Sequence, residues 1–164
     1  MKEIETIAPE KIVYLDESGV DNKVYREYGR ALRGREVPGE VSGKKANRLS
    51  VIAGLRKKNL TAPFRFEGYC DTDVFNTWIE ECLLPELTLG DVVVLDNASF
   101  HKSSKTEELI SSKGCRILFL PTYSPDLNPI ENKWAIVKAR IRKHREPEQP
   151  LEEILDEVLT MMCN

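Results

Sequence analysis

The chain has 164 residues, a length that suits one domain with a sizeable buried core. Apolar residues make up 41% and charged residues 31%, which favours a globular protein over a disordered chain. The formal net charge of −3, taken alone, disfavours a protein that binds a polyanion.

The net charge conceals two strongly basic segments. Residues 23–58 hold 11 Lys and Arg against 3 Asp and Glu, and residues 133–145 hold 6 against none, so together they carry +14. If both segments share one face, that face can bind a phosphate backbone despite the acidic total. Charge alone leaves the alternative open that they form separate solvated faces.

No segment of the sequence predicts contact with a membrane. The longest purely apolar runs have four residues, whereas a membrane span needs about 20. Residues 1–10 lack the apolar core of a secretion signal, so we expect a cytoplasmic protein. The cysteines include no Cys-x-x-Cys pair, which favours reduced, mostly buried thiols over a zinc site: Cys70, Cys82, Cys115 and Cys163.

The first third of the chain predicts strands. Residues 12–15 form a short apolar run that ends at Asp16, typical of a buried strand. Residues 24–32 and 49–56 predict two further strands, with a Gly- and Lys-rich loop between them, and residues 63–68 extend the sheet.

A helix follows, because apolar residues recur on one helical face from residue 74 to residue 83. Asp71 or Thr72 caps its start, and Pro85 ends it. Residues 92–95 then give the strongest strand signal in the chain. They are apolar on both faces, which predicts a central strand covered by helices on each side.

The last part of the chain alternates helices with one more strand. Ser104 and Glu107 match a capping box for a short helix closed by Gly114, and residues 116–120 predict a buried strand. After a proline-rich loop over 121–125, Asn128 caps a third helix, and residues 151–162 form a last amphipathic helix. This order predicts one α/β domain over residues 1–164, with a mixed sheet and helices on its faces.

Three acids stand at positions that suit chemistry. Asp16 and Asp96 directly follow apolar strand runs, and Glu131 lies in the first turn of the third helix. Acids at strand ends point into the crevice where α/β sheets bind ligands, and three carboxylates suit Mg²⁺ or Mn²⁺. The alternatives also stay open: the two aspartates serve as turn residues, and Glu131 completes a cap.

The surroundings of these acids are specific. The motifs read LDESG at 15–19, LDNASFH at 95–101 and LPTYSPDLNPIENKW at 120–134, and 34 residues separate Asp96 from Glu131. From about residue 12 to about residue 144, the chain closely resembles the DDE transposases, in particular the bacterial insertion-sequence branch of the mariner superfamily.

That resemblance implies a ribonuclease H-like fold, a five-stranded mixed sheet flanked by helices. It also implies a catalytic triad of Asp16, Asp96 and Glu131, which are also the metal ligands. We expect two Mg²⁺ ions, with Mn²⁺ as a substitute. Asp16 bridges both ions, Asp96 binds one and Glu131 the other. Water first frees the transposon ends, and a 3′-hydroxyl then attacks target DNA.

Further residues are candidates for DNA contact or for the neighbourhood of the triad. Lys138 and Arg142 share a face of the third helix with Glu131, and His101 and Asn97 lie in the second motif. A cluster in the first basic segment forms a DNA-contacting loop: Arg33, Arg35, Lys44, Lys45 and Arg48. The alternatives are a solvated basic face for the cations and a structural role for His101.

Other prominent side chains have structural interpretations. Asp71 and Asp73 suit a helix N-terminus better than a metal pair, and Trp78 and Trp134 suit the core.

The resemblance further implies a homodimer in the active complex and a bacterial, nucleoid-associated location. The family's N-terminal helix-turn-helix region is absent before Asp16, so we expect it to be missing or encoded separately. This chain alone then binds DNA weakly. Two alternatives remain: a ribonuclease H-like nuclease or resolvase without strand transfer, and a catalytically silent DNA-binding protein descended from a transposase.

Overall fold

In the described part of the chain, five strands form one mixed sheet in the order β3-β2-β1-β4-β5. β1 (Ile12–Val20), β2 (Leu49–Arg56) and β3 (Asn59–Glu67) pair antiparallel, whereas β4 (Val92–Leu95) and β5 (Arg116–Phe119) run parallel to β1. The computed structural model describes residues 4–20, 49–121, 127–146 and 148–163. The strand expected at 24–32, the loop at 33–47 and most of the loop at 121–125 lie outside these residues.

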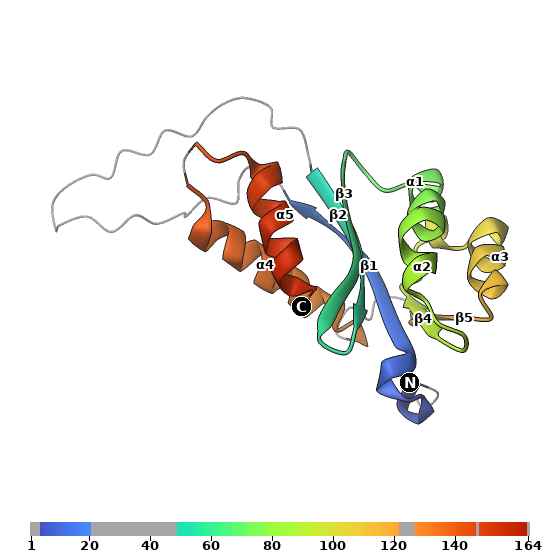
Figure 1. Cartoon of the computed structure of the whole chain (residues 1–164). Coiled ribbons are helices and arrows are strands. Elements are labelled where there is room, and N and C mark those ends of the chain that lie inside the picture. Colours follow the sequence, from blue (N-terminus) through green and yellow to red (C-terminus); the bar gives the residue numbers. More distant parts are fainter. Residues whose placement is uncertain (1–3, 21–48, 122–126, 147, 164) are drawn as a thin grey trace, which may run out of the picture.

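Helices cover both faces of the sheet, as Figure 1 shows. On one face lie α1 (Thr72–Trp78), a π-helical turn (Ile79–Leu83), the short α2 (Leu84–Glu86) and α3 (Ser104–Ser112). On the other face, α4 (Ile130–His144) packs beside α5 (Leu151–Met162). Short 3-10 turns complete the described chain at Ile4–Thr6, Pro9–Lys11 and Ser99–His101.

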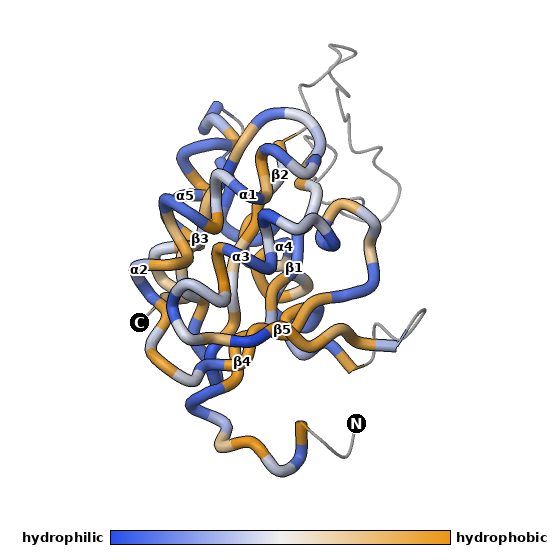
Figure 2. The backbone as a smooth tube through the Cα atoms, turned by 90° about the vertical axis from the view of Figure 1, so that its right-hand side faces the viewer, coloured by the Kyte–Doolittle hydropathy of each residue, from blue (hydrophilic) through white to orange (hydrophobic). Residues whose placement is uncertain are grey.

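The alternation of side chains along the strands divides the interior into two cores. Val13, Leu15 and Ile52 pack against α1 and α3, and Val51 and Ala53 pack against α4 and α5. Figure 2 shows the hydrophobic backbone positions gathered along β1, β4 and β5. The mixed α/β sheet flanked by helices, expected from the sequence, is therefore present.

The central strand β4 is covered differently from the expectation on one of its faces. Val93 and Leu95 pack against the helices α1 and α3, as predicted. Val92 and Val94 instead pack against partly buried residues that include Ile4 in the first 3-10 turn. Helices thus cover β4 on one side, and a short N-terminal segment contributes to the cover on the other.

Predicted boundaries of three helices are wrong. Pro85 does not end its helix, which runs on to Glu86 after a π-helical turn in which the Leu84 N–H donates to the Ile79 carbonyl. The cap of α3 is Ser103, whose hydroxyl accepts from the Thr106 N–H at 3.1 Å, rather than Ser104.

α4 begins one residue later than expected, with Pro129 in the N-cap position instead of Asn128. The predicted cap at Asp71 is confirmed, because its carboxylate accepts from the Val74 N–H at 2.9 Å. All four cysteines are free thiols, but only Cys115 is buried, so the expectation of mostly buried thiols is wrong. No helix in the described ranges is long and apolar enough to cross a membrane.

A buried carboxylate, that of Asp91, connects three strands at one end of the sheet. Asp91 has no exposed side-chain surface, and its Oδ2 accepts from Arg56 Nη2 at 2.8 Å and from the Thr88 N–H at 2.8 Å. Lys11 Nζ lies 3.6 Å from Oδ1. Arg56 also donates to the backbone carbonyl of Glu10, so Asp91 joins the ends of β1, β2 and β4.

Replacing Asp91 with Asn should lower the free energy of unfolding by about 3 kcal/mol at pH 7, because Arg56 keeps its position but loses its counter-charge. Burial raises the pKa of Asp91, but its hydrogen bonds from Arg56 and Thr88 outweigh burial, so the pKa lies below its ordinary value. This stabilisation is full above about pH 4 and is lost as the pH falls further. Urea unfolding from pH 7 to pH 3 measures the difference, with the exposed Glu108→Gln as control; an equal effect of both variants would contradict it.

Candidate active site

The parallel pairing of β1 with β4 brings two of the expected acids to the same level. The register of this pairing joins Ile12 to Val92 and Tyr14 to Val94. Two residues further along each chain come Asp16 and Asp96, just where β4 ends at Leu95. Asp16 was expected directly after its strand. It lies inside β1 instead, because β1 continues alongside β2 as far as Val20.

Asp16 is held in an unfavourable electrostatic environment. Its Oδ2 accepts a hydrogen bond from Trp134 Nε1 at 2.9 Å. Burial raises the pKa of Asp16 to about 7, and repulsion from Glu131 and Glu17 adds to this against the smaller effect of Trp134. The site therefore concentrates negative charge that the described residues only partly compensate.

Glu131 reaches this site because Asn128 fixes the start of α4 on β1. The buried Asn128 donates from Nδ2 to the Leu15 carbonyl at 3.3 Å, and its own carbonyl accepts from the Glu131 N–H at 3.2 Å. Asn128 Oδ1 lies 3.5 Å from the N–H of Ile130. Asn128 thus connects the first turn of α4 to the residue before Asp16, so the carboxylate of Glu131 lies close enough to repel Asp16.

Asp96 is bound by the loop that follows β4. Its Oδ1 accepts from the Ala98 N–H at 2.9 Å and lies 2.7 Å from His101 Nδ1. Its side chain is nevertheless 51% exposed. The hydrogen bond from His101, together with that from Ala98, outweighs burial and lowers the pKa of Asp96, so this carboxylate is stable in its charged form.

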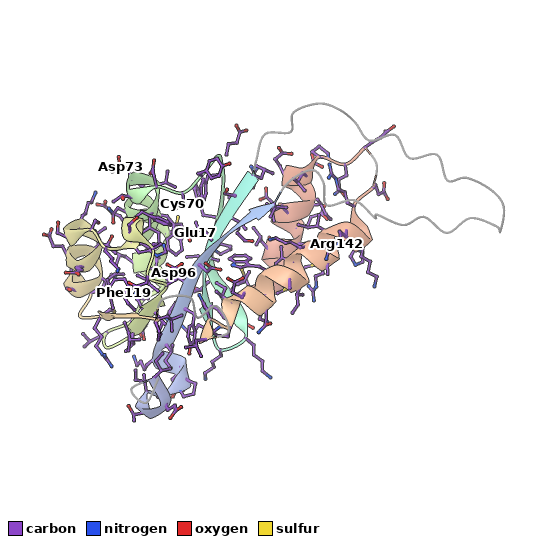
Figure 3. All side chains as sticks on the ribbon, turned by 180° about the vertical axis from the view of Figure 1, so that it is seen from behind. Glu17, Cys70, Asp73, Asp96, Phe119 and Arg142 are labelled. Carbon is purple, nitrogen blue, oxygen red and sulfur yellow. The ribbon has the colours of Figure 1, made fainter. Side chains whose placement is uncertain are left out.

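His101 joins Asp96 to a fourth acid that the sequence did not indicate. The ring is fully buried, and its Nε2 lies 2.8 Å from Oε1 of Glu17. Burial lowers the pKa of His101, but the hydrogen bonds to Asp96 and Glu17 outweigh it and raise the pKa to about 9. Both ring nitrogens therefore donate. Figure 3 shows Glu17 and Asp96 near one another beside β1, with Arg142 across β1 on α4.

Sequence reasoning could find only part of the role of two further residues at the site, Glu17 and Trp134. Glu17 lies next to Asp16 in the first motif, but adjacent residues of a strand point to opposite faces, and no sequence pattern pairs Glu17 with His101. Trp134 has the apolar spacing of a core residue and is 2% exposed, yet its indole N–H reaches Asp16. Asn97 directly follows Asp96, and its role stays a prediction.

The three expected acids are of the type that binds a hard divalent cation, although their side chains do not converge on one point in this structure. No group of three or more His, Cys, Asp or Glu side chains in the described ranges is arranged to hold a metal ion. Asp16, Asp96 and Glu131 nevertheless offer carboxylate oxygens, and a cation would relieve the repulsion of Asp16 by Glu131. The convergence of all three on shared ions stays a prediction.

The basic residues of α4 divide between two sides of the helix. At 100° per residue, Glu131, Lys138 and Arg142 lie within about 40° of one another. Along the axis, Lys138 is about 10 Å and Arg142 about 16 Å from Glu131. The five candidates from Arg33 to Arg48 lie outside the described residues, so their DNA contact stays a prediction, as it does for Lys138 and Arg142.

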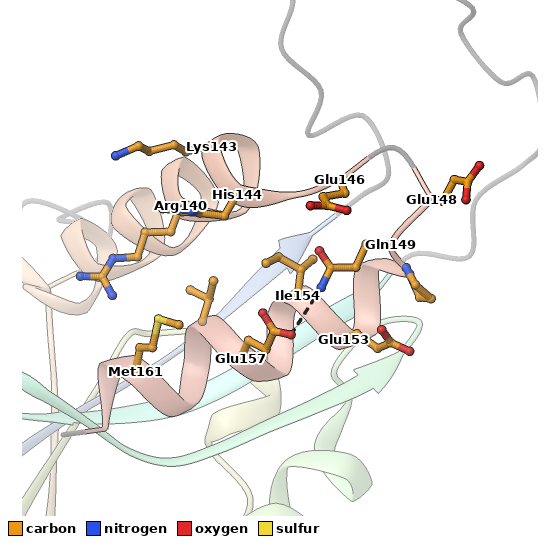
Figure 4. Close-up of a pocket in the computed structure, with 12 residues that line it drawn as sticks. Arg140, Lys143, His144, Glu146, Glu148, Gln149, Glu153, Ile154, Glu157 and Met161 are labelled. Atoms are coloured by element: carbon orange, nitrogen blue, oxygen red, sulfur yellow. Dashed lines mark hydrogen bonds between the residues drawn. The ribbon is translucent and has the colours of Figure 1, made fainter.

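The opposite side of α4 borders a groove of about 890 Å³ along α5. Figure 4 shows Arg140 and Lys143 on the α4 side of this groove and Glu153 and Glu157 on the α5 side. The acids of α5 partly offset the basic charge there. The groove includes none of the three expected catalytic acids.

Comparison with known sequences identifies the family. The sequence profile of the DDE superfamily endonucleases matches residues 11–151. The chain belongs to this family. Over 42 residues, 26% of this chain and 13% of the relative, the DDE endonuclease chain is 48% identical to the transposable element Tc3 transposase of Caenorhabditis elegans. Over 99 residues, 58% of this chain and 65% of the relative, it is 28% identical to an uncharacterised protein of Sinorhizobium fredii.

Solved structures match the fold of this DDE endonuclease chain. The Mos1 mariner paired-end complex with Mg aligns with a TM-score of 0.72 and 13% identity, over 98% of this chain and 51% of that chain. The Mos1 catalytic domain aligns with a TM-score of 0.63 and 12% identity, over 97% and 74%. The expected ribonuclease H-like fold is confirmed. The chain spans about half of the full Mos1 chains and less than two thirds of the curated relatives.

The two aspartates should respond in opposite ways to loss of charge. In EDTA, Asp16→Asn should raise the melting temperature, because the raised pKa of Asp16 means that its negative charge destabilises the folded state. This destabilisation begins above about pH 4 and is complete above about pH 7. The gain is therefore larger at pH 8 than at pH 5. Asp96→Asn should lower the melting temperature at both values, because the lowered pKa of Asp96 means that its charge stabilises the fold. Thermal unfolding followed by circular dichroism measures both, and a shift of the same sign in the two variants would refute this account.

Proposed function

We propose that this chain is the catalytic domain of a DNA transposase, related to the bacterial insertion-sequence branch of the mariner superfamily. It cleaves phosphodiester bonds at transposon ends and transfers the resulting 3′-hydroxyl into target DNA. The observation that carries the proposal is the alignment of Asp16 with Asp96 across β1 and β4, with Glu131 tied to the same place by Asn128. The family match and the motifs around these acids support it.

Asp16, Asp96 and Glu131 would hold two Mg²⁺ ions, or Mn²⁺ in their place, within this site. When bound, such ions stabilise the charge that develops on the attacking and leaving oxygens of the phosphodiester. The protein's own contribution is to orient the ligands. Trp134 holds one oxygen of Asp16, and His101 with the Ala98 N–H holds one oxygen of Asp96. The Mos1 paired-end complexes with Mg and with Mn support this choice of metals.

DNA is the proposed partner, and α4 carries the described part of its contact surface. Lys138 and Arg142 extend from the Glu131 side of α4, away from the acids of α5. Cations at about 10 and 16 Å from Glu131 suit phosphates that flank the scissile one. The Mos1 structures that contain paired transposon ends support a homodimer in the active complex. A separate helix-turn-helix region would supply recognition of the terminal repeats.

The triad is tested by cleavage of a labelled transposon-end duplex in Mg²⁺. Asp16→Asn, Asp96→Asn and Glu131→Gln should each reduce the cleavage rate at least 1,000-fold, an estimated loss of about 4 kcal/mol of transition-state stabilisation. The exposed Asp73→Asn on α1 serves as the control and should keep the wild-type rate. Cleavage by Asp96→Asn at the wild-type rate would show that the triad assignment is wrong.

Strand transfer is tested separately, with precleaved ends and a supercoiled target. Joined products from the wild-type chain, absent with Glu131→Gln, would support a transposase. Cleavage without joining would support the alternative of a ribonuclease H-like nuclease or resolvase. Binding of DNA with neither reaction would support a catalytically silent relative.

The DNA surface is tested by the salt dependence of binding. The double variant Lys138→Ala with Arg142→Ala should weaken binding equally for different DNA sequences, because phosphates carry no sequence information. The slope of log affinity against log salt should fall by about 2, since each lost phosphate contact removes about 1. Fluorescence anisotropy measures both quantities. Lys113→Ala, exposed at the end of α3, is the control, and a slope equal to that of wild type would contradict the assignment.

A further inference from the structure

We propose that Glu17 and His101 are positioning residues that hold one oxygen of Asp96, so that its other oxygen is directed to a divalent cation. The inference rests on the proposed function, in which Asp96 is a metal ligand. It adds to that function a role for two residues from different elements, one in β1 and one in the 3-10 turn after β4.

One imidazole ring spans two carboxylates. Its Nδ1 lies 2.7 Å from Asp96 Oδ1, and its Nε2 lies 2.8 Å from Glu17 Oε1. These distances are those of strong, charge-assisted hydrogen bonds. Because β1 fixes Glu17, the ring cannot shift along the line between the two acids without lengthening one of these bonds. The position of Asp96 Oδ1 is therefore set by the strand that also carries Asp16.

Aromatic side chains restrict the remaining freedom of the ring. Phe75, fully buried in α1, has its ring centroid 4.4 Å from that of His101, and Phe100 lies at 4.2 Å. Just beyond the turn, Ser103 accepts from Asn76 Nδ2 of α1 at 3.1 Å. The turn that carries His101 is thus fastened to α1 through packing and through a hydrogen bond.

Asp96 needs such support because the fold does little else to orient it. Its side chain is 51% exposed, whereas those of His101 and Glu17 are 1% and 15% exposed. Apart from His101, the backbone N–H of Ala98 bonds to Oδ1, the same oxygen. Both contacts therefore act on one oxygen. A metal ligand oriented in this way loses less rotational freedom when it binds an ion.

A purely structural role explains this arrangement poorly. Burying an imidazole between two acids is costly, and packing apolar residues of similar volume is often equally or more stabilising. Glu17 also points to the opposite face of β1 from Asp16. It is therefore placed to act on Asp96 through His101 rather than to bind an ion beside Asp16.

The inference is tested by Mn²⁺ affinity and DNA cleavage in three variants. Glu17→Gln keeps the volume and one acceptor oxygen but removes the charge. His101→Asn keeps a donor near the place of Nδ1, toward Asp96, whereas His101→Gln keeps one near the place of Nε2, toward Glu17. Glu67→Gln, exposed at the end of β3, is the matched control. Electron paramagnetic resonance measures free Mn²⁺, and melting temperature is recorded in EDTA.

We expect Glu17→Gln to weaken Mn²⁺ binding about 10-fold and His101→Gln about 100-fold, the range found for residues that orient metal ligands. His101→Asn should lose less than His101→Gln, because it keeps the contact with Asp96. The cleavage rate at saturating DNA should follow the same order. A merely structural role would lower the melting temperature of both His101 variants without this order in Mn²⁺ affinity.

Each outcome decides the inference. Wild-type Mn²⁺ affinity in Glu17→Gln and His101→Gln would overturn it, while leaving the proposed function intact if the wild-type chain cleaves DNA. Cleavage absent in wild type, with Mn²⁺ affinity that still depends on Glu17 and His101, would overturn the proposed function but support the positioning role. No Mn²⁺ binding by the wild-type chain would overturn both. If the His101 variants do not fold, the isosteric Glu17→Gln decides.

Discussion

The parallel pairing of β1 with β4 is the constraint on which the site depends. It sets Asp16 and Asp96 at one level of the sheet, and a shift of that register by one residue would turn one of them to the other face. The pairing is protected on both sides, because β1 continues along β2 and β4 is bordered by β5. Asp91 secures the opposite ends of the same strands through Arg56. The position of the carboxylates therefore follows from backbone pairing rather than from any contact between them.

Acids at neighbouring positions have opposite roles because β1 presents one to each core. Asp16 faces α4, where it is half-buried beside Trp134 and repelled by Glu131, and its pKa rises to about 7. Glu17 faces α1, where His101 compensates its charge. The surroundings of Asp16 therefore favour a bound cation, whereas Glu17 already has a cationic partner in His101. This contrast follows from the two-residue alternation of a strand.

The sequence predicts the fold well where a regular spacing of apolar residues coincides with residues that begin or end a helix or strand. The apolar run at Val92–Leu95 and the stripe of α4 are local patterns; β4 forms where expected, and α4 begins within one residue of its expected start. Boundaries fail where a neighbour in space decides them. β1 extends past Asp16 because β2 offers it a partner, and the side chain of Asn128 joins the start of α4 to the carbonyl of Leu15. The link from Glu17 to His101 spans 84 residues, so no local pattern predicts it.

The uneven distribution of charge along the chain also has a physical consequence at the site. Asp16 and Glu131 create a negative potential at the place where a phosphodiester would have to enter. In the proposed complex, DNA and the metal-free site would repel one another, while Lys138 and Arg142, about 10 and 16 Å from Glu131 along the axis of α4, would attract the flanking phosphates. A bound divalent cation would remove the repulsion and so strengthen DNA binding. By thermodynamic linkage, bound DNA strengthens metal binding by the same factor. In the proposed complex, cations at a distance from the acids would guide DNA to the site without neutralising the carboxylates that would hold the metal.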